Sequence, residues 1–292
     1  MPDFTLHAPD SLQEACEILT RYDGEARVIA GGTALVLMVR QGFVSPRALV
    51  RLDRIPGLAG IAVEDSVLRL GATATLRAAS ESSVVQGSLP ALAATCHLVG
   101  NVRVRNAATV GGNVCEADYA SDPPGLLVAL DAIARIQGPT GTREIPVRDL
   151  ITDFYETSLA ANEIVTEIRV PLLPAGAHAV YLKYVTRSSE DRPCVGATAV
   201  VRLDDRGNLS DLRVAVGAVS GTPIRLREVE ARAVGQRPTA DLFREIGARY
   251  AEAADPVSDA RGSADYRKQM VAVFVRRALQ EAADGTAVAR KY

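Results

Sequence analysis

Two segments of the chain, residues 28–35 and 109–113, place adjacent glycines among small and polar residues. The first reads Val28-Ile29-Ala30-Gly31-Gly32-Thr33-Ala34-Leu35, an apolar strand pattern that runs into Gly-Gly and then a helical pattern. Because glycine allows close backbone approach and left-handed φ, successive N–H groups in such a turn form an anion-binding concavity. The N-terminus of the following helix adds partial positive charge. The segment therefore predicts a diphosphate cradle that needs no lysine.

The second segment repeats this arrangement around Gly111 and Gly112 within residues 105–114. Thr109 and Asn113 flank the glycines and offer side-chain donors and acceptors. Chance alone predicts roughly two Gly-Gly pairs for 23 glycines in 292 residues, and two are present. The pairs by themselves are therefore uninformative, and the prediction depends on the residues around them.

Two carboxylates, Asp118 and Asp122, follow the second glycine pair. Carboxylates accept O–H hydrogen bonds, so beside a phosphate cradle they suit sugar or polyol hydroxyls. Lys183 lies in a strand pattern, and by position alone it is interpreted as an exposed strand lysine. Nothing in the sequence pairs Cys115 or Cys194 with a base, which predicts buried or inert thiols.

The predicted elements put both glycine segments at the ends of regular structure. A strand pattern over 26–30 precedes the first pair and a helical pattern over 33–41 follows it. The second pair lies in a polar stretch over 100–122, which follows helical patterns over 75–85 and 90–99. Further strand patterns cover 48–52, 60–63, 67–71, 132–136, 143–147 and 163–171.

The last third of the chain has a different order of elements. Strand patterns come first and helical patterns follow, which predicts an α+β domain with helices on one face of a sheet. The boundary before it is predicted at residues 172–176, Leu-Leu-Pro-Ala-Gly. The predicted strands are 180–185, 195–203 and 209–219, and the predicted helices are 224–234, 239–254 and 264–283.

Composition excludes several classes of protein. Formal net charge is −2, from 33 basic and 35 acidic residues, so no nucleic-acid partner is predicted. No run of about 18 apolar residues exists, and no transmembrane span is predicted. The four cysteines are widely spaced, which predicts reduced thiols in a cytoplasmic protein without a zinc or iron–sulfur site of its own.

Taken together, these segments resemble the FAD-binding medium subunit of the molybdenum hydroxylases, the family of xanthine dehydrogenase and carbon monoxide dehydrogenase. The likeness covers nearly the whole chain in the family's order. The segments that carry it are 29–33, 109–113 with 117–122, 163–171, Tyr181-Leu182-Lys183-Tyr184 and the predicted last helix.

The resemblance implies an α+β fold in two domains. Residues 1–173 would form a two-lobed FAD-binding domain of the vanillyl-alcohol-oxidase type, with lobes at about 1–57 and 58–173. Residues 178–285 would form a small three-stranded antiparallel sheet with helices. FAD would lie between the lobes, with its diphosphate on both glycine segments.

The resemblance also implies individual cofactor-binding residues. Val99 and Val165 would pack on FAD, and Lys183 would lie near the isoalloxazine ring, where a cation favours the anionic reduced flavin. Asp191 falls in a loop that resembles one beside the flavin. Ala34 stands where many relatives carry a polar residue, so only its backbone would make contact. The full set is Val28, Ile29, Ala30, Gly31, Gly32, Thr33, Ala34, Leu35, Val99, Thr109, Val110, Gly111, Gly112, Asn113, Asp118, Asp122, Val165, Lys183 and Asp191.

The function implied by the resemblance is electron transfer within a heterotrimer. In the family, a large subunit hydroxylates the substrate at a molybdenum–pterin centre, and a small subunit passes electrons through [2Fe–2S] clusters to FAD. The flavin then reduces NAD⁺, O₂ or another small-molecule acceptor. Two alternatives remain open from the residues: a self-sufficient FAD-dependent oxidase or dehydrogenase, and a non-redox scaffold that keeps the fold.

Overall fold

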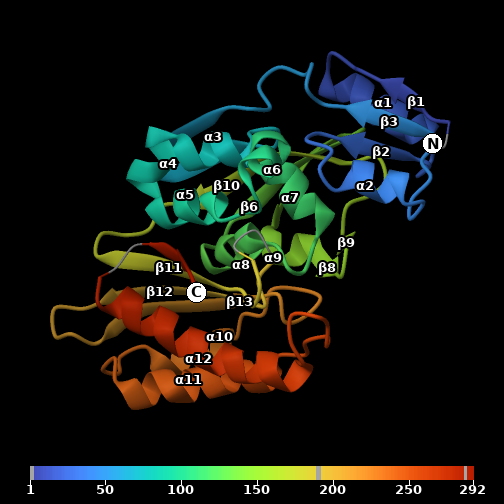
Figure 1. Cartoon of the computed structure of the whole chain (residues 1–292). Helices are drawn as coiled ribbons and strands as arrows, with labels where there is room; N and C mark the ends of the chain where they lie inside the picture. The colour runs from blue at the N-terminus through green and yellow to red at the C-terminus, as the bar shows by residue number, and fades with distance from the viewer. Residues whose placement is uncertain (1–2, 189–191, 286–287) are drawn as a thin grey trace.

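The computed structural model describes residues 3–188, 192–285 and 288–292. Figure 1 shows an N-terminal lobe, a second lobe built on its own sheet, and a C-terminal domain of a sheet covered by long helices. This mixture of helices and sheets confirms the predicted α+β class. Among the described helices, none is long and apolar enough to cross a membrane.

The N-terminal lobe is a parallel sheet in the order β1-β3-β2. Ser11 begins the first helix by accepting a hydrogen bond from Glu14 N at 3.2 Å, as its sequence predicts. Since β2 ends at Ile29, the first glycine segment leaves the sheet at the carboxyl end of a parallel strand. The elements are β1 (Thr5–His7), α1 (Leu12–Arg21), β2 (Ala26–Ile29), α2 (Leu35–Arg40) and β3 (Ala48–Arg51).

The second lobe is an antiparallel sheet in the order β4-β5-β10-β6-β7, with helices packed against one face. Alternating residues such as Leu68, Leu70 and Ile168 point into the core beneath the helices. Its strands are β4 (Ile61–Glu64), β5 (Val67–Gly71), β6 (Ile133–Gly138), β7 (Gly141–Pro146), β10 (Ile164–Pro171) and the small hairpin β8 (Ile151–Asp153) and β9 (Glu156–Thr157).

The helices of this lobe correct two predictions. The pattern over 75–85 forms two short helices, because Ser82 ends the first and caps the second. The stretch 100–122, in which the sequence predicted polar residues and no helix, contains two short helices capped by Asn101 and Thr109. The helices are α3 (Leu76–Glu81), α4 (Ser83–Ser88), α5 (Pro90–His97), α6 (Val102–Ala107), α7 (Val110–Glu116), α8 (Asp122–Ala129) and α9 (Val147–Leu150).

The C-terminal domain contains the predicted antiparallel strands and one further strand. The sheet order is β13-β12-β11-β14, and the short β14 pairs in parallel with β11. Ile224 pairs with Val216, so the helix predicted from 224 begins later. The elements are β11 (Ala177–Tyr184), β12 (Val195–Leu203), β13 (Leu209–Gly217), α10 (Arg227–Ala233), α11 (Ala240–Ala253), α12 (Ala264–Ala283) and β14 (Ala289–Lys291).

The two faces of this sheet have different partners. Val180 and Leu182 of β11 pack in a core with α11 and α12, the orange and red helices of Figure 1. Ala179 joins the core of the second lobe instead, because successive strand residues point to opposite faces. Tyr181 and Lys183 follow the same alternation, so β11 directs them toward the second lobe.

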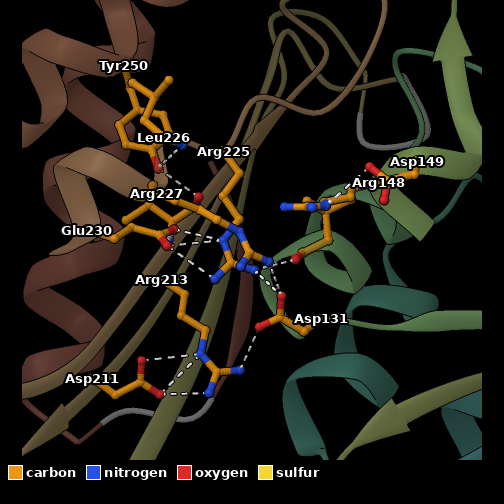
Figure 2. A network of polar contacts seen from close by, with 12 residues as sticks. Asp131, Arg148, Asp149, Asp211, Arg213, Arg225, Leu226, Arg227, Glu230 and Tyr250 are labelled. Carbon is orange, nitrogen blue, oxygen red and sulfur yellow. Dashed lines mark hydrogen bonds and ion pairs between the residues drawn. The ribbon is translucent and has the colours of Figure 1, made fainter. Parts of the chain in front are cut away.

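Helix α8 is the element that docks the two domains. All of its residues are buried, and charged groups bind it at both ends. At its C-terminal end, Figure 2 shows Asp131 accepting hydrogen bonds from Arg225 and Arg227, each at 2.8 Å. Arg225 also donates to Val128 O at 2.9 Å and is paired with Glu230. At its N-terminal end, Asp122 binds residues of β11.

Candidate functional site

A cavity of about 620 Å³ lies where the two lobes and the C-terminal domain meet. Its walls come from the segment after β2, from α7, from β10 and from β11. The two glycine segments, far apart in sequence, therefore face one space. The predicted residues that line it are Val28, Ile29, Ala30, Gly31, Gly32, Thr33, Ala34, Leu35, Val99, Thr109, Gly111, Gly112, Asn113, Asp118, Asp122, Val165 and Lys183.

The first glycine segment forms an open loop with unused donors. Within the described ranges, the N–H groups of Gly31, Gly32, Thr33 and Ala34 donate to no protein acceptor. Gly32 has a φ of 67°, in the left-handed region that favours glycine. A Cβ at Gly31 would lie 1.9 Å from Ala107 O, so only glycine lets this loop touch the second lobe. Any anion site at this position would consist of the loop amides, because α2 has only 6 residues.

The second glycine segment differs from its prediction. Gly111 and Gly112 lie inside the first turn of α7, and their amides already have acceptors. Gly111 N donates to Ala72 O at 2.9 Å, and Gly112 N donates to Thr109 Oγ1 at 3.1 Å. A Cβ at Gly111 would lie 2.5 Å from Ala72 Cβ. These two amides are therefore not free for a ligand, whereas the segment packs closely on Ala72 and gives the cavity a wall without side chains. Its role in cofactor binding stays a prediction.

Of three further residues predicted to bind the cofactor, one is buried, one lines the cavity and one lies outside the described residues. Val110 is buried in the core of the second lobe and is not among the residues that line the cavity, so the contact predicted for it stays a prediction. Asn113 lines the cavity, and its amide exchanges hydrogen bonds with Ser121 at 2.8 and 3.0 Å. Asp191 lies outside the described residues.

Lys183 is buried in an ion pair and is not the exposed strand lysine that its position suggested. Its Nζ donates to Asp122 Oδ2 at 2.8 Å and to Leu98 O at 3.0 Å, and the side chain is 1% exposed. The Tyr181 hydroxyl donates to Asp122 Oδ1 at 2.6 Å. Burial raises the pKa of the Asp122 carboxyl, while Lys183 and Tyr181 oppose that rise. Asp122 of α8 and Lys183 of the C-terminal domain thus form a buried charge pair in the cavity wall.

A second polar cluster lies at the rim. Arg192 Nη2 pairs with Asp118 Oδ2 at 2.8 Å, and Arg192 Nη1 donates to the Tyr155 hydroxyl at 3.2 Å. Tyr155 in turn donates to Asp118 Oδ1 at 3.3 Å. These contacts join the α7–α8 connection, the β8–β9 turn and the segment after β11.

Several lining residues were missed from the sequence, among them Cys115, Glu116, Tyr155 and Arg192. Glu116 could have been found once α7 is placed, because it lies three residues after Asn113 on the same helix face. Burial raises the pKa of the Glu116 carboxyl, and it raises that of the Cys115 thiol to about 12. Among the described residues, no group of His, Cys, Asp and Glu could hold a metal ion.

The cavity suits a nucleotide cofactor that contains a diphosphate. Its volume lies within the range of cofactor pockets. The free loop amides favour an anion beside them, while the lining residues Glu116 and Asp118 disfavour one near their carboxyl groups. Val99 and Val165 add apolar wall. The fold and site therefore define a protein that binds an extended nucleotide cofactor between two lobes.

Comparison with known proteins identifies the family. Residues 2–173 match the family described as the FAD binding domain in molybdopterin dehydrogenase, and residues 180–282 match the CO dehydrogenase flavoprotein C-terminal domain. The chain belongs to this family of FAD-binding flavoprotein subunits, as the resemblance in its sequence implied.

Individual relatives match over almost their full length. The carbon monoxide dehydrogenase medium chain of Hydrogenophaga pseudoflava is 33% identical over 96% of this chain and 97% of its own. The xanthine dehydrogenase FAD-binding subunit of Escherichia coli O157:H7 is 30% identical over 97% of each chain. Among solved structures, carbon monoxide dehydrogenase from Hydrogenophaga pseudoflava lacking the Mo-pyranopterin moiety superposes with a TM-score of 0.94, at 34% identity over 98% of this chain and 99% of that one. The chain is therefore an oxidoreductase subunit.

Proposed function

We propose that this chain binds FAD in the cavity and passes electrons from a partner's iron–sulfur clusters to an external acceptor. The main support is that the N–H groups from Gly31 to Ala34 have no acceptor among the described residues and face a cavity large enough for a cofactor. The chain also belongs to a family with an FAD-binding domain. Bound FAD supplies the redox chemistry, and the chain supplies binding, orientation and electrostatic surroundings.

The charged and polar groups that line the cavity favour one orientation of the bound cofactor. The loop amides from Gly31 to Ala34 donate to the diphosphate, because they have no other acceptor among the described residues. Glu116 and Asp118 line another part of the cavity, where a phosphate would meet carboxylates. That part suits the hydroxyl-bearing chain and the ring system instead. The diphosphate therefore lies against the N-terminal lobe.

Lys183 acts as an oriented donor and not as an isolated cation. An ammonium has three N–H groups, and two of them bind Asp122 and Leu98 O. The remaining N–H is available to the cofactor, while Asp122 compensates most of the positive charge. Val99 and Val165 complete the apolar wall of the ring site. The flavin contact implied for Asp191 by the resemblance stays a prediction.

The assembly and the acceptor complete the proposal. A large molybdenum–pterin subunit and a small iron–sulfur subunit would join this chain in a heterotrimer, since the named relatives are medium or FAD-binding subunits. A small-molecule oxidant would accept the electrons. The described cysteines are free thiols, which fits a cytoplasmic protein. The domains would span 1–173 and 178–285, with the lobes divided near residue 57.

The test is a titration of the purified full chain with FAD, riboflavin and ADP. FAD should bind and change the visible flavin spectrum, and ADP should compete because it carries the diphosphate. Riboflavin, which lacks phosphate, should bind at least about 100-fold more weakly than FAD, a difference of about 2.7 kcal/mol. A chain that binds no FAD, or binds riboflavin equally well, would contradict the proposal.

A second experiment tests the relay itself. The chain is expressed together with its neighbouring genes and purified by a tag on the chain. Co-purification of two further polypeptides with molybdenum and iron supports the proposed assembly. A yellow chain that oxidises substrates alone would instead support the self-sufficient oxidase.

A further inference from the structure

Tyr155 occupies the rim of the cavity in a backbone conformation that tyrosine rarely adopts. It lies in the turn between β8 and β9, lines the cavity, and is 43% exposed. Its φ is 59°, in the left-handed region. For a residue other than glycine this conformation costs roughly 1–2 kcal/mol. The residue therefore stays in a strained position while much of its side chain faces solvent.

The surrounding contacts hold this conformation in place. Tyr155 N donates to Ala117 O at 3.0 Å, and Ala117 is itself left-handed with a φ of 48°. The Tyr155 ring packs edge-on against Tyr119 at 6.5 Å, and Tyr119 packs against Phe154 at 5.0 Å. Strained residues persist where the surroundings over-determine them, and they cluster at functional sites.

The hydroxyl of Tyr155 is fixed between opposite charges. It donates to Asp118 Oδ1 and accepts from Arg192 Nη1, at 3.3 and 3.2 Å. Arg192 and Asp118 also pair directly, so the three side chains form a closed cluster. Burial and the Asp118 carboxylate raise the pKa of Tyr155, and the hydroxyl stays protonated as the donor to Asp118. The ring therefore has one defined position at the rim.

Packing alone does not account for this arrangement. A side chain left 43% exposed buries only part of its apolar surface, so the free energy gained by burial does little more than offset the backbone strain. Neighbouring Phe154 has similar exposure, 37%, and is not among the described residues that line the cavity. Of these two neighbouring rings, the ring of Tyr155 is the one that lines the cavity.

We propose that Tyr155 is a specificity-determining residue that shields the ring system of the bound cofactor from small oxidants such as dioxygen. The inference rests on the proposed function, which directs the ring system toward Lys183. Tyr155 stands on that side, because it donates to Asp118, whose carboxylate acts electrostatically on Asp122, the ion-pair partner of Lys183. The shield limits which acceptors collect the electrons.

The experiment uses the full chain loaded with FAD, without partner subunits. The flavin is reduced anaerobically with dithionite and mixed with oxygenated buffer, and its reoxidation is followed by absorbance. Each reduced flavin gives two electrons to O₂, which takes up two protons and leaves as H₂O₂. Tyr155→Gly should reoxidise about tenfold faster than the unmodified chain, whereas Tyr155→Phe, which keeps the ring, should change little.

The stability of the variants distinguishes a shielding role of Tyr155 from a purely structural one. Glycine adopts a φ of 59° without strain, so Tyr155→Gly should unfold at the same or a higher denaturant concentration. Tyr155→Asn is a second variant that also tolerates this conformation. Phe154→Ala is the matched control, because it removes a neighbouring exposed ring outside the cavity and should reoxidise at the unmodified rate.

The outcomes are distinguishable. FAD-loaded Tyr155→Gly and Tyr155→Asn that reoxidise at the unmodified rate would overturn the shield and leave the proposed function intact. Equally fast flavin reoxidation in Phe154→Ala would also overturn the shield, because the faster rate would then come from general loosening of the turn between β8 and β9. An unmodified chain that binds no FAD would contradict the proposed function, and the shield with it.

Discussion

Gly31-Gly32 and Gly111-Gly112 face the same cavity, yet their backbones have different roles. In the first pair the N–H groups have no acceptor among the described residues and are available to a ligand. In the second pair both N–H groups are bonded within the protein, to Ala72 O and Thr109 Oγ1. A shared sequence pattern thus covers one loop with free amides and one tightly packed helix start.

The difference comes from the residues on either side of each pair. A free carbonyl or hydroxyl acceptor near the N-terminus of a helix removes its donors from ligand binding. Thr109 is such an acceptor for α7, while Ala34 at the start of α2 has no side-chain acceptor. A residue just before the helix therefore decides whether a glycine pair binds a ligand through its amides. Substitutions at the glycines and at Thr109 test that distinction.

The largest effect is expected at Gly31. In Gly31→Ala the new Cβ would lie 1.9 Å from Ala107 O, which is backbone and cannot rotate away. The loop must move, and the free amides move with it. We expect FAD affinity to fall at least about 100-fold, measured by fluorescence titration. Gly60→Ala is the control, since its Cβ would meet nothing within 4 Å. Unchanged affinity in Gly31→Ala would remove the cradle from this loop.

Gly112→Val should have a smaller effect on the same measurement. Gly112 is exposed to the cavity, and its Cβ would meet mainly the Thr109 Oγ1 atom at 2.7 Å. The added side chain would project from a wall that glycine keeps smooth, so we expect about tenfold weaker FAD binding. If FAD binds Gly112→Val as tightly as the unmodified chain, the cofactor does not lie against α7.

The sequence predicted the first glycine segment better than the second for a physical reason. Around Gly31, an apolar strand pattern is followed directly by glycine, which ends a strand. The local preference of the sequence therefore agrees with the structure. Around Gly111, glycine disfavours helix locally, but Thr109 capping and packing on Ala72 override that preference. The polar stretch predicted there is therefore helical in the structure.

Long-range partners explain the remaining differences. Lys183 looked like an exposed strand lysine because its counter-charge, Asp122, is far away in sequence. Tyr155 and Arg192 reach the cavity through turns that carry no periodic signal. The resemblance to the family supplied the lysine and both valines, whereas the rim cluster is visible only in three dimensions.

Gly111→Ala should alter stability more than binding. Its Cβ would lie 2.5 Å from Ala72 Cβ and 2.9 Å from Ala72 Cα, which forces α7 away from β5. Overpacking of this kind typically costs about 1–3 kcal/mol of unfolding free energy. Chemical denaturation of the cofactor-free chain measures it. Ala72→Gly in the same chain should restore part of the loss, and a fully additive double variant would argue against this contact.

Thr109→Ala is expected to have the smallest effect and to make the second segment resemble the first. Loss of the Thr109 hydroxyl removes the cap on Gly112 N and should lower unfolding free energy by about 1 kcal/mol. The freed N–H then lacks a protein acceptor, as the amides after Gly31 do, and becomes available to an anion. FAD should therefore bind Thr109→Ala at least as tightly as the unmodified chain, with Thr109→Ser unchanged in both properties. A large loss of FAD affinity in Thr109→Ala, absent in Thr109→Ser, would show that the hydroxyl itself binds the cofactor and that capping is not its main role.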